Sequence, residues 1–165
     1  MVASSGTAKV TLPADDQILI TREFDAPRHL VFRAVTDPEL VQRWWGAQRG
    51  DEVTAEIDLR VGGTWRYVMQ SNHGMEVAFH GEYREIVENE RIVSTEVFEG
   101  APVPDPDALA TVNTMTLTEV DGRTRLETLV VAPNQEVRDA IIDSGMEGGM
   151  QESFDALEEV AISLK

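Results

Sequence analysis

MEGGMQESFDALEEVAISL, residues 146–164, closes the chain with the pattern of an amphipathic helix. Its apolar side chains recur at steps of three and four residues, the spacing that places them along one stripe of a helix. The acidic side chains between them fall mostly outside this stripe. We therefore expect a long C-terminal helix that begins near Pro133-Asn134 and covers an apolar surface. The stripe consists of Met146, Met150, Phe154, Leu157, Ala161 and Leu164.

Glycines interrupt the helical pattern near its start. Gly145, Gly148 and Gly149 lie where each costs roughly 1 kcal/mol relative to alanine in a helix interior. Two interpretations follow from this cost. The glycines mark a break between two helical segments, or they let another group approach the backbone closely.

Upstream of this helix, apolar residues alternate with polar ones, as they do in half-buried strands. Short turns such as Gly62-Gly63 and Asp121-Gly122 separate the alternating segments. Turns of this length join antiparallel neighbours, because a parallel pair needs a longer crossover. We predict strands at residues 17–24, 51–60, 65–70, 75–84, 91–98, 111–119 and 124–131.

Two short helices are expected after the first strand. Asp25-Ala-Pro27 and Thr36-Asp-Pro38 each combine a capping residue with a proline suited to a first helical turn. Gly46 is expected to end the second helix, directly after Trp44 and Trp45.

This order of elements predicts an α+β fold, in which a curved antiparallel sheet of about six to seven strands wraps around the long C-terminal helix. A chain of 165 residues has the usual size of one domain. We expect residues 1–8 to form a flexible N-terminus and residues 9–165 to form a single domain.

The composition argues against several classes of function. The chain has 30 acidic residues against 14 Lys and Arg, a net charge of −16, which opposes contact with nucleic acids and anionic membranes. No apolar run is long enough for a membrane span, and the start has no features of a secretory signal. There is no cysteine, which excludes disulfides and thiolate metal sites. We expect a cytoplasmic protein.

An ordered set of motifs runs through nearly the whole chain: ITREFDAP (20–27), VF (31–32), TDP (36–38), WWG (44–46), GGTW (62–65), GEYRE (81–85), ERIV (90–93), TLTE (116–119), SGM (144–146) and ESF (152–154). The set resembles the START-like, or helix-grip, superfamily. Within it, the motifs are similar to a bacterial branch related to the activator of the heat-shock protein 90 ATPase. The resemblance implies an apolar cavity between sheet and C-terminal helix, where members of the superfamily hold lipids, sterols, polyketides or hormones.

Aromatic and methionine side chains are the main candidates for contact with such a ligand. Each of them alone is explained by ordinary core packing. Together they suit a pocket, because a sheet curled around one helix leaves space and methionine adapts to irregular apolar surfaces. Of the adjacent tryptophans, we expect one in the core and the other at the pocket lip. The candidates are Trp44, Trp45, Trp65, Tyr67, Met69, Phe79, Met115, Met146, Met150 and Phe154.

The remaining chemistry-bearing residues form no known constellation. His29, His73 and His80 lack the spacing of metal ligands, and His80 is expected on the solvent face of its strand, opposite Phe79 and Tyr83. We find no catalytic triad, phosphate-binding loop or dinucleotide motif. We therefore expect no metal site, no cofactor and no catalytic residue.

Three functions remain under consideration. The first is binding of a small apolar or amphipathic molecule without covalent chemistry, by a monomer or homodimer. The second is a co-chaperone-like module that binds a chaperone partner. The third is a cyclase- or hydrolase-type enzyme that uses the same cavity, although no acid/base pair in the sequence supports it.

Overall fold

The computed structural model describes residues 8–45, 52–70, 74 and 76–165. Gly46, Asp51 and His73 lie outside the described residues. The elements along the chain are β1 (Lys9–Thr11), β2 (Gln17–Phe24), α1 (Arg28–Thr36), α2 (Pro38–Trp44), β3 (Glu52–Ile57), β4 (Thr64–Gln70), β5 (Glu76–Val87), β6 (Arg91–Phe98), the 3₁₀ helix η2 (Pro106–Leu109), β7 (Thr111–Val120), β8 (Arg123–Val131), α3 (Gln135–Asp143) and α4 (Met146–Ser163).

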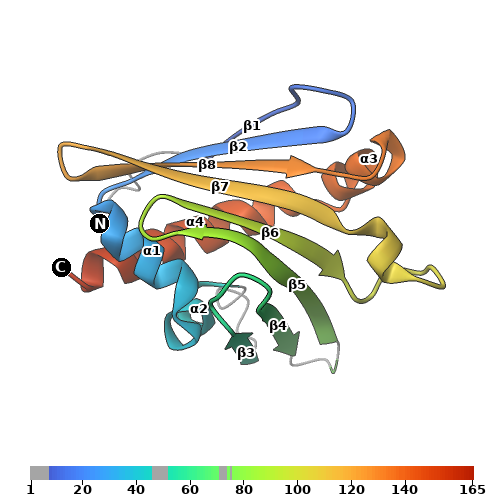
Figure 1. Cartoon of the computed structure of the whole chain (residues 1–165), viewed down its shortest axis with the longest axis horizontal. Coiled ribbons are helices and arrows are strands. Elements are labelled where there is room, and N and C mark those ends of the chain that lie inside the picture. Colours follow the sequence, from blue (N-terminus) through green and yellow to red (C-terminus); the bar gives the residue numbers. More distant parts are fainter. Residues whose placement is uncertain (1–7, 46–51, 71–73, 75) are drawn as a thin grey trace.

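The strands form one antiparallel sheet in the order β1-β2-β8-β7-β6-β5-β4-β3 (Figure 1). From β3 to β8 the sheet is a meander, and β2 returns to pair with β8. The predicted α+β helix-grip fold is confirmed. The strand β1, which the alternation did not reveal, adds a short edge strand beside β2.

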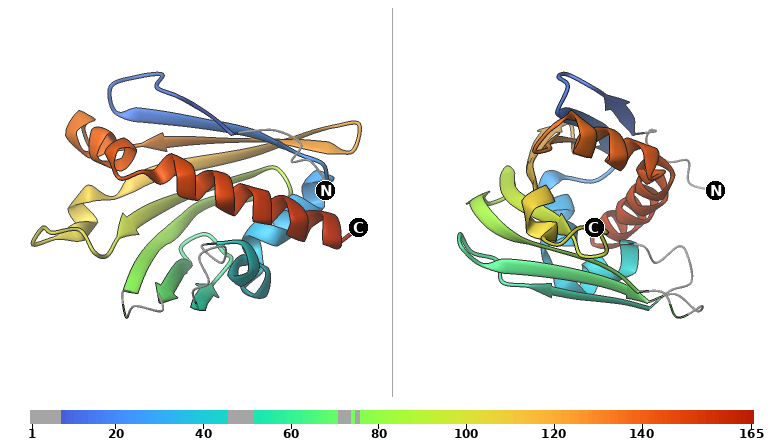
Figure 2. Two further views of the ribbon diagram at one scale, coloured as in Figure 1. Left: turned by 180° about the vertical axis from the view of Figure 1, so that it is seen from behind. Right: turned by 90° about the vertical axis from the view of Figure 1, so that its right-hand side faces the viewer.

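The helices lie on one side of this curved sheet. Figure 2 shows α4 crossing the concave face, with α1 and α2 beside its C-terminal half. The main core forms where these helices meet the sheet, and it includes Phe24, Leu117, Leu126 and Leu157. The apolar stripe predicted for the C-terminal helix therefore does cover the sheet.

The tail contains two helices rather than one continuous helix. Helix α3 begins after Asn134, whose side-chain Oδ1 accepts a hydrogen bond from the Val137 amide at 2.9 Å. The break lies at Ser144-Gly145, where Gly145 has a φ of 80°. Glycine adopts this left-handed conformation without the steric cost that a Cβ brings. The first interpretation of the glycines is therefore correct for Gly145, whereas Gly148 lies inside α4.

The start of the described chain is fastened to α4. Ala8 is buried; its amide donates to Gln151 Oε1 at 3.1 Å, and its carbonyl accepts from Gln151 Nε2 at 2.8 Å. Gln151 thus satisfies both backbone groups of residue 8. The division into an N-terminal segment and one domain stays a prediction. Within the described residues, no helix combines the length and apolar character that a membrane crossing requires.

Candidate functional site

The pairing register shows which strand residues face α4. Residues directly opposite in an antiparallel pair share a face of the sheet. Tyr67 of β4 pairs with Phe79 of β5, and Phe79 pairs with Phe98 of β6. Tyr67 and Phe79 pack against the helix-covered core, so this row of rings lies on the concave face.

The ten candidate ligand-contacting residues divide into two groups. Trp44 and Trp65 are buried core residues. The Trp44 indole Nε1 donates to the Ala34 carbonyl at 2.9 Å, which fixes the ring between α1 and α2. The other eight keep partial solvent exposure: Trp45, Tyr67, Met69, Phe79, Met115, Met146, Met150 and Phe154.

Trp45 joins the aromatic row from the end of α2. Its ring centroid lies 5.5 Å from that of Tyr67 and 5.7 Å from that of Phe79. Phe98 extends the row, 5.2 Å from Phe79, and remains 44% exposed. Sequence analysis did not single out Phe98, although the alternation of strand 91–98 places it on the same face as Ile92.

Met146, Met150 and Phe154 are the candidate residues on α4. They pack against a second apolar cluster that contains Ile18, Ile20 and Val130 of the sheet. Phe154 also meets Phe24 edge to face at 5.7 Å, so its ring connects the two clusters. Met115 packs against the main cluster, while Met69 belongs to neither cluster.

Polar groups also lie on this concave face, and sequence analysis did not identify them. Glu96 of β6 pairs with Thr111 of β7, and Ser94 pairs with Asn113, in the same alternation as the core residue Ile92. Asn113 Nδ2 donates to Glu96 Oε1 at 3.5 Å, and Thr111 Oγ1 donates to Asn113 Oδ1 at 2.9 Å. Burial raises the pKa of Glu96, and the hydrogen bond from Asn113 opposes this rise only in part.

Two tyrosine hydroxyls accompany Glu96. Burial raises the pKa of Tyr67, and the neighbouring Tyr83 and Glu96 raise it further. Burial also raises the pKa of Tyr83, a residue only 4% exposed. Neither hydroxyl makes a hydrogen bond within the described part of the chain.

Arg22 is a buried cation on the same face of β2 as Phe24. Its guanidinium contacts Asp155 Oδ1 at 2.8 Å and Glu158 Oε1 at 3.4 Å, both on α4. Glu158 is itself buried and accepts a hydrogen bond from the Asp25 amide at 2.9 Å. The acidic residues of this helix were expected to lie outside its buried stripe, and this expectation is wrong for Glu158. Its buried carboxylate is compensated by the Arg22 guanidinium and by the hydrogen bond from the Asp25 amide.

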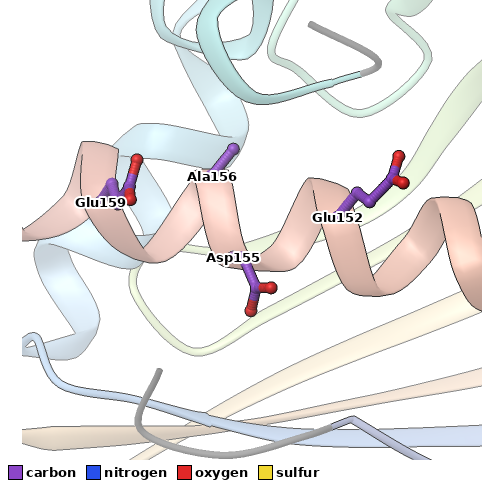
Figure 3. Close-up of a pocket in the computed structure, with 4 residues that line it drawn as sticks. All are labelled: Glu152, Asp155, Ala156 and Glu159. Atoms are coloured by element: carbon purple, nitrogen blue, oxygen red, sulfur yellow. The ribbon is translucent and has the colours of Figure 1, made fainter. Parts of the chain in front are cut away.

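A pocket of about 350 Å³ lies along α4, where Glu152, Asp155, Ala156 and Glu159 line it. In Figure 3, Glu152, Ala156 and Glu159 point to one side of the helix, whereas Asp155 points to the other. Three of these four lining residues are acidic, and two of them, Glu152 and Glu159, lie on the same side of α4.

A second pocket, of about 520 Å³, lies on the outer face of the sheet and is lined by Arg66, His80, Glu99, Pro106 and Asp107. Arg66 holds Glu99 with hydrogen bonds of 2.9 and 3.0 Å. His80 contacts Glu99 through Nδ1 at 2.8 Å and Asp107 through Nε2 at 3.1 Å. Hydrogen bonds from Arg66, and then His80, lower the pKa of Glu99 to about 2.

This outer cluster fastens η2 to the sheet. As predicted, His80 lies on the face opposite Phe79, and its contacts with Glu99 and Asp107 give it a structural role there. Asp107 of η2 contacts this outer face through His80. In the part of the chain that the structure describes, no group of three or more His, Cys, Asp or Glu side chains is arranged to hold a metal ion.

Solved bacterial structures resemble this fold closely. A protein of Rhodobacter sphaeroides has a TM-score of 0.83 at 23% identity, covering 96% of this chain and 99% of the other. A protein of Arthrobacter aurescens has a TM-score of 0.80 at 26% identity, covering 94% and 91%. A protein of Chromobacterium violaceum has a TM-score of 0.75 at 28% identity, covering 90% and 98%.

The sequence comparisons agree with this likeness. No curated protein matches the chain. The family model described as "Activator of Hsp90 ATPase homolog 1-like protein" matches residues 25–161, which include the aromatic row and almost all of α4. The chain therefore belongs to the Activator of Hsp90 ATPase homolog 1-like family, a branch of the START-like superfamily.

Proposed function

We propose that this protein binds a small apolar or amphipathic molecule between the concave face of the sheet and α4, without covalent chemistry. The observation that carries the proposal is the partial exposure of the aromatic and methionine side chains beneath the helix. Tyr67, Phe79 and Met115 of the sheet, and Met150 and Phe154 of α4, all keep solvent-accessible surface.

Apolar side chains in such a position favour a ligand. Surface that α4 leaves uncovered stays in contact with water, and a ligand that covers it gains about 25 cal/mol for each Å² removed from water. Methionines on the helical wall adapt to ligands of different shape. The rings of Trp45, Tyr67 and Phe79 supply rigid walls with little loss of side-chain entropy.

Native mass spectrometry tests the proposal directly. We expect the purified protein to carry, or to take up from a library of apolar compounds, one small molecule per chain. A change in tryptophan fluorescence should accompany binding, because Trp45 contacts the aromatic row. Met150→Glu places a charge on the helical wall and should abolish binding. Val120→Glu, at an exposed hairpin residue, is the matched control and should bind normally.

The folded state of both variants is checked by circular dichroism. Absence of binding by the wild-type protein to every member of a broad apolar library would contradict the proposal.

A co-chaperone-like interaction is a second candidate, favoured by the description of the family. It requires the protein to bind a chaperone and change its ATPase rate. Adding the protein to a bacterial chaperone of the heat-shock protein 90 class and measuring ATP hydrolysis is the test. An unchanged rate at saturating protein excludes this function.

A further inference from the structure

The concave face carries an acid, Glu96, that makes no ion pair with a cation of the described residues. Within the described residues, Glu96 accepts one side-chain hydrogen bond. Asn113 donates it, and it is long, at 3.5 Å. Arg22, the buried cation of this face, is already paired with Asp155 and Glu158. The Glu96 carboxyl therefore has no cation of its own among these partners.

Two tyrosine hydroxyls that make no hydrogen bond to another described residue share this face with the acid. Tyr67 of β4 and Tyr83 of β5 lie on the concave face with Glu96, and neither hydroxyl makes a hydrogen bond to the Glu96 carboxyl. Tyr83 pairs with Ser94, which lies two positions before Glu96 on the same face of β6, so the tyrosine and the acid belong to neighbouring strands of the concave face. Polar groups that converge in an apolar pocket, without partners of their own, are the usual means of orienting a ligand.

The chemistry of the group that fits follows from these neighbours. We infer that the ligand is an amphipathic amine, whose ammonium group contacts Glu96 and the hydroxyls of Tyr67 and Tyr83 while its apolar body lies along the aromatic and methionine walls. An ammonium has three N–H donors, and the carboxylate and the phenol oxygens can accept them. The faces of Tyr67 and Trp45 also attract a cation.

Charge distinguishes this ligand from a neutral or anionic one. The net charge of −16 attracts cations toward the protein and repels carboxylates. Burial makes ionised Glu96 costly in the free protein, and an incoming ammonium offsets that cost. A fatty-acid anion would place a second negative charge beside Glu96, and Arg22 is not available to balance it.

This inference rests on the proposed function, and the test separates the two. Wild-type protein is titrated near neutral pH with n-decylamine, n-decanol and n-decanoate by isothermal calorimetry, so that the hydrocarbon chain is constant and the head group varies. We expect the amine to bind about tenfold more tightly than the alcohol, and the carboxylate to bind most weakly.

Glu96→Gln keeps the size of the side chain and removes its charge, so it should reduce the affinity for the amine to that for the alcohol. Glu82→Gln changes the total charge equally at an exposed residue of β5 and should keep the preference of the wild type. Circular dichroism and a thermal melt establish that both variants fold.

Each outcome decides one question. If the alcohol or the carboxylate binds as tightly as the amine, or if Glu96→Gln keeps the preference for the amine, the inference is wrong while apolar ligand binding stands. If none of the three probes binds the folded wild-type protein at any soluble concentration, the inference is overturned, whereas binding of another library compound would still support the proposed function.

Discussion

Single residues decide how α4 is held against the sheet. Arg22 projects from β2 into a contact with Asp155 and Glu158. Glu158 also accepts a hydrogen bond from the amide of Asp25, which lies between β2 and α1. A buried ion pair gives little net stability relative to an apolar pair, but loss of one partner leaves a buried charge uncompensated. The pair therefore specifies the position of α4 more than it stabilises the fold.

Arg22→Met should lower the free energy of unfolding by about 3–5 kcal/mol, because Glu158 would remain buried without its cation. Urea denaturation measures this loss. The double variant Arg22→Met/Glu158→Leu should recover most of it. A double variant that is less stable than Arg22→Met would show that Glu158 does not depend on Arg22 for its charge balance.

At the level of elements, the glycines of the C-terminal helices have different roles. Gly145 separates α3 from α4 and has a φ of 80°. Residues with a side chain rarely adopt this backbone conformation. Gly148 lies in α4, and a Cβ added there would meet no atom within 4 Å. The first glycine is thus needed for the break, whereas the second only weakens the helix.

Gly148→Ala should raise the free energy of unfolding by roughly 0.5–1 kcal/mol, because alanine loses less backbone entropy in a helix. Gly145→Ala should lower it by about 1–2 kcal/mol, because alanine is strained in the left-handed region. Thermal melts of the two variants, compared with the wild type, provide the measurement. Equal effects of the same sign would contradict these separate roles.

On the scale of the whole molecule, two carboxyls respond to pH in opposite directions. Glu99, which contacts Arg66 of β4 and His80 of β5 on the outer face, has its pKa lowered from 4.5 to about 2. Its stabilisation is present above pH 4.5 and is lost as the pH falls toward 2. Glu96, on the concave face, has a raised pKa, so its contribution is present at low pH and is lost as the pH rises through that value.

Urea denaturation between acid and neutral pH tests both signs. Glu99→Gln should reduce the free energy of unfolding at neutral pH by about 1–2 kcal/mol, a figure discounted for solvent screening, and should make the loss of stability in acid smaller.

Glu96→Gln should be at least as stable as the wild type at neutral pH, because it removes a costly buried charge. The raised pKa of Glu96 would be contradicted if Glu96→Gln were less stable than the wild type at neutral pH and lost stability in acid as the wild type does.

The order of elements could be predicted from the sequence, because periodicity reports which face of a strand or helix is buried. The antiparallel meander, the two short helices and the covering stripe of the tail all follow from local patterns and turn lengths. The short edge strand β1 could not be predicted, because three residues are too few to display an alternation.

The candidate site was predictable only in part. Aromatic and methionine residues indicated an apolar surface, but the pattern could not separate Trp44 and Trp65 in the core from their half-buried neighbours. Glu96 and Asn113 also lie on alternating positions, yet nothing local reveals that β6 and β7 bring them into contact.

By itself, the sequence determined the elements, their antiparallel order and the acidic surface, since these depend on local periodicity, turn chemistry and composition. Only the tertiary structure decided that Arg22 meets Glu158, more than a hundred residues away, and that Glu96 shares the concave face with Tyr67. The physical reason is that strand register and the path of α4 result from packing of the whole chain, and they bring together side chains that no local pattern relates.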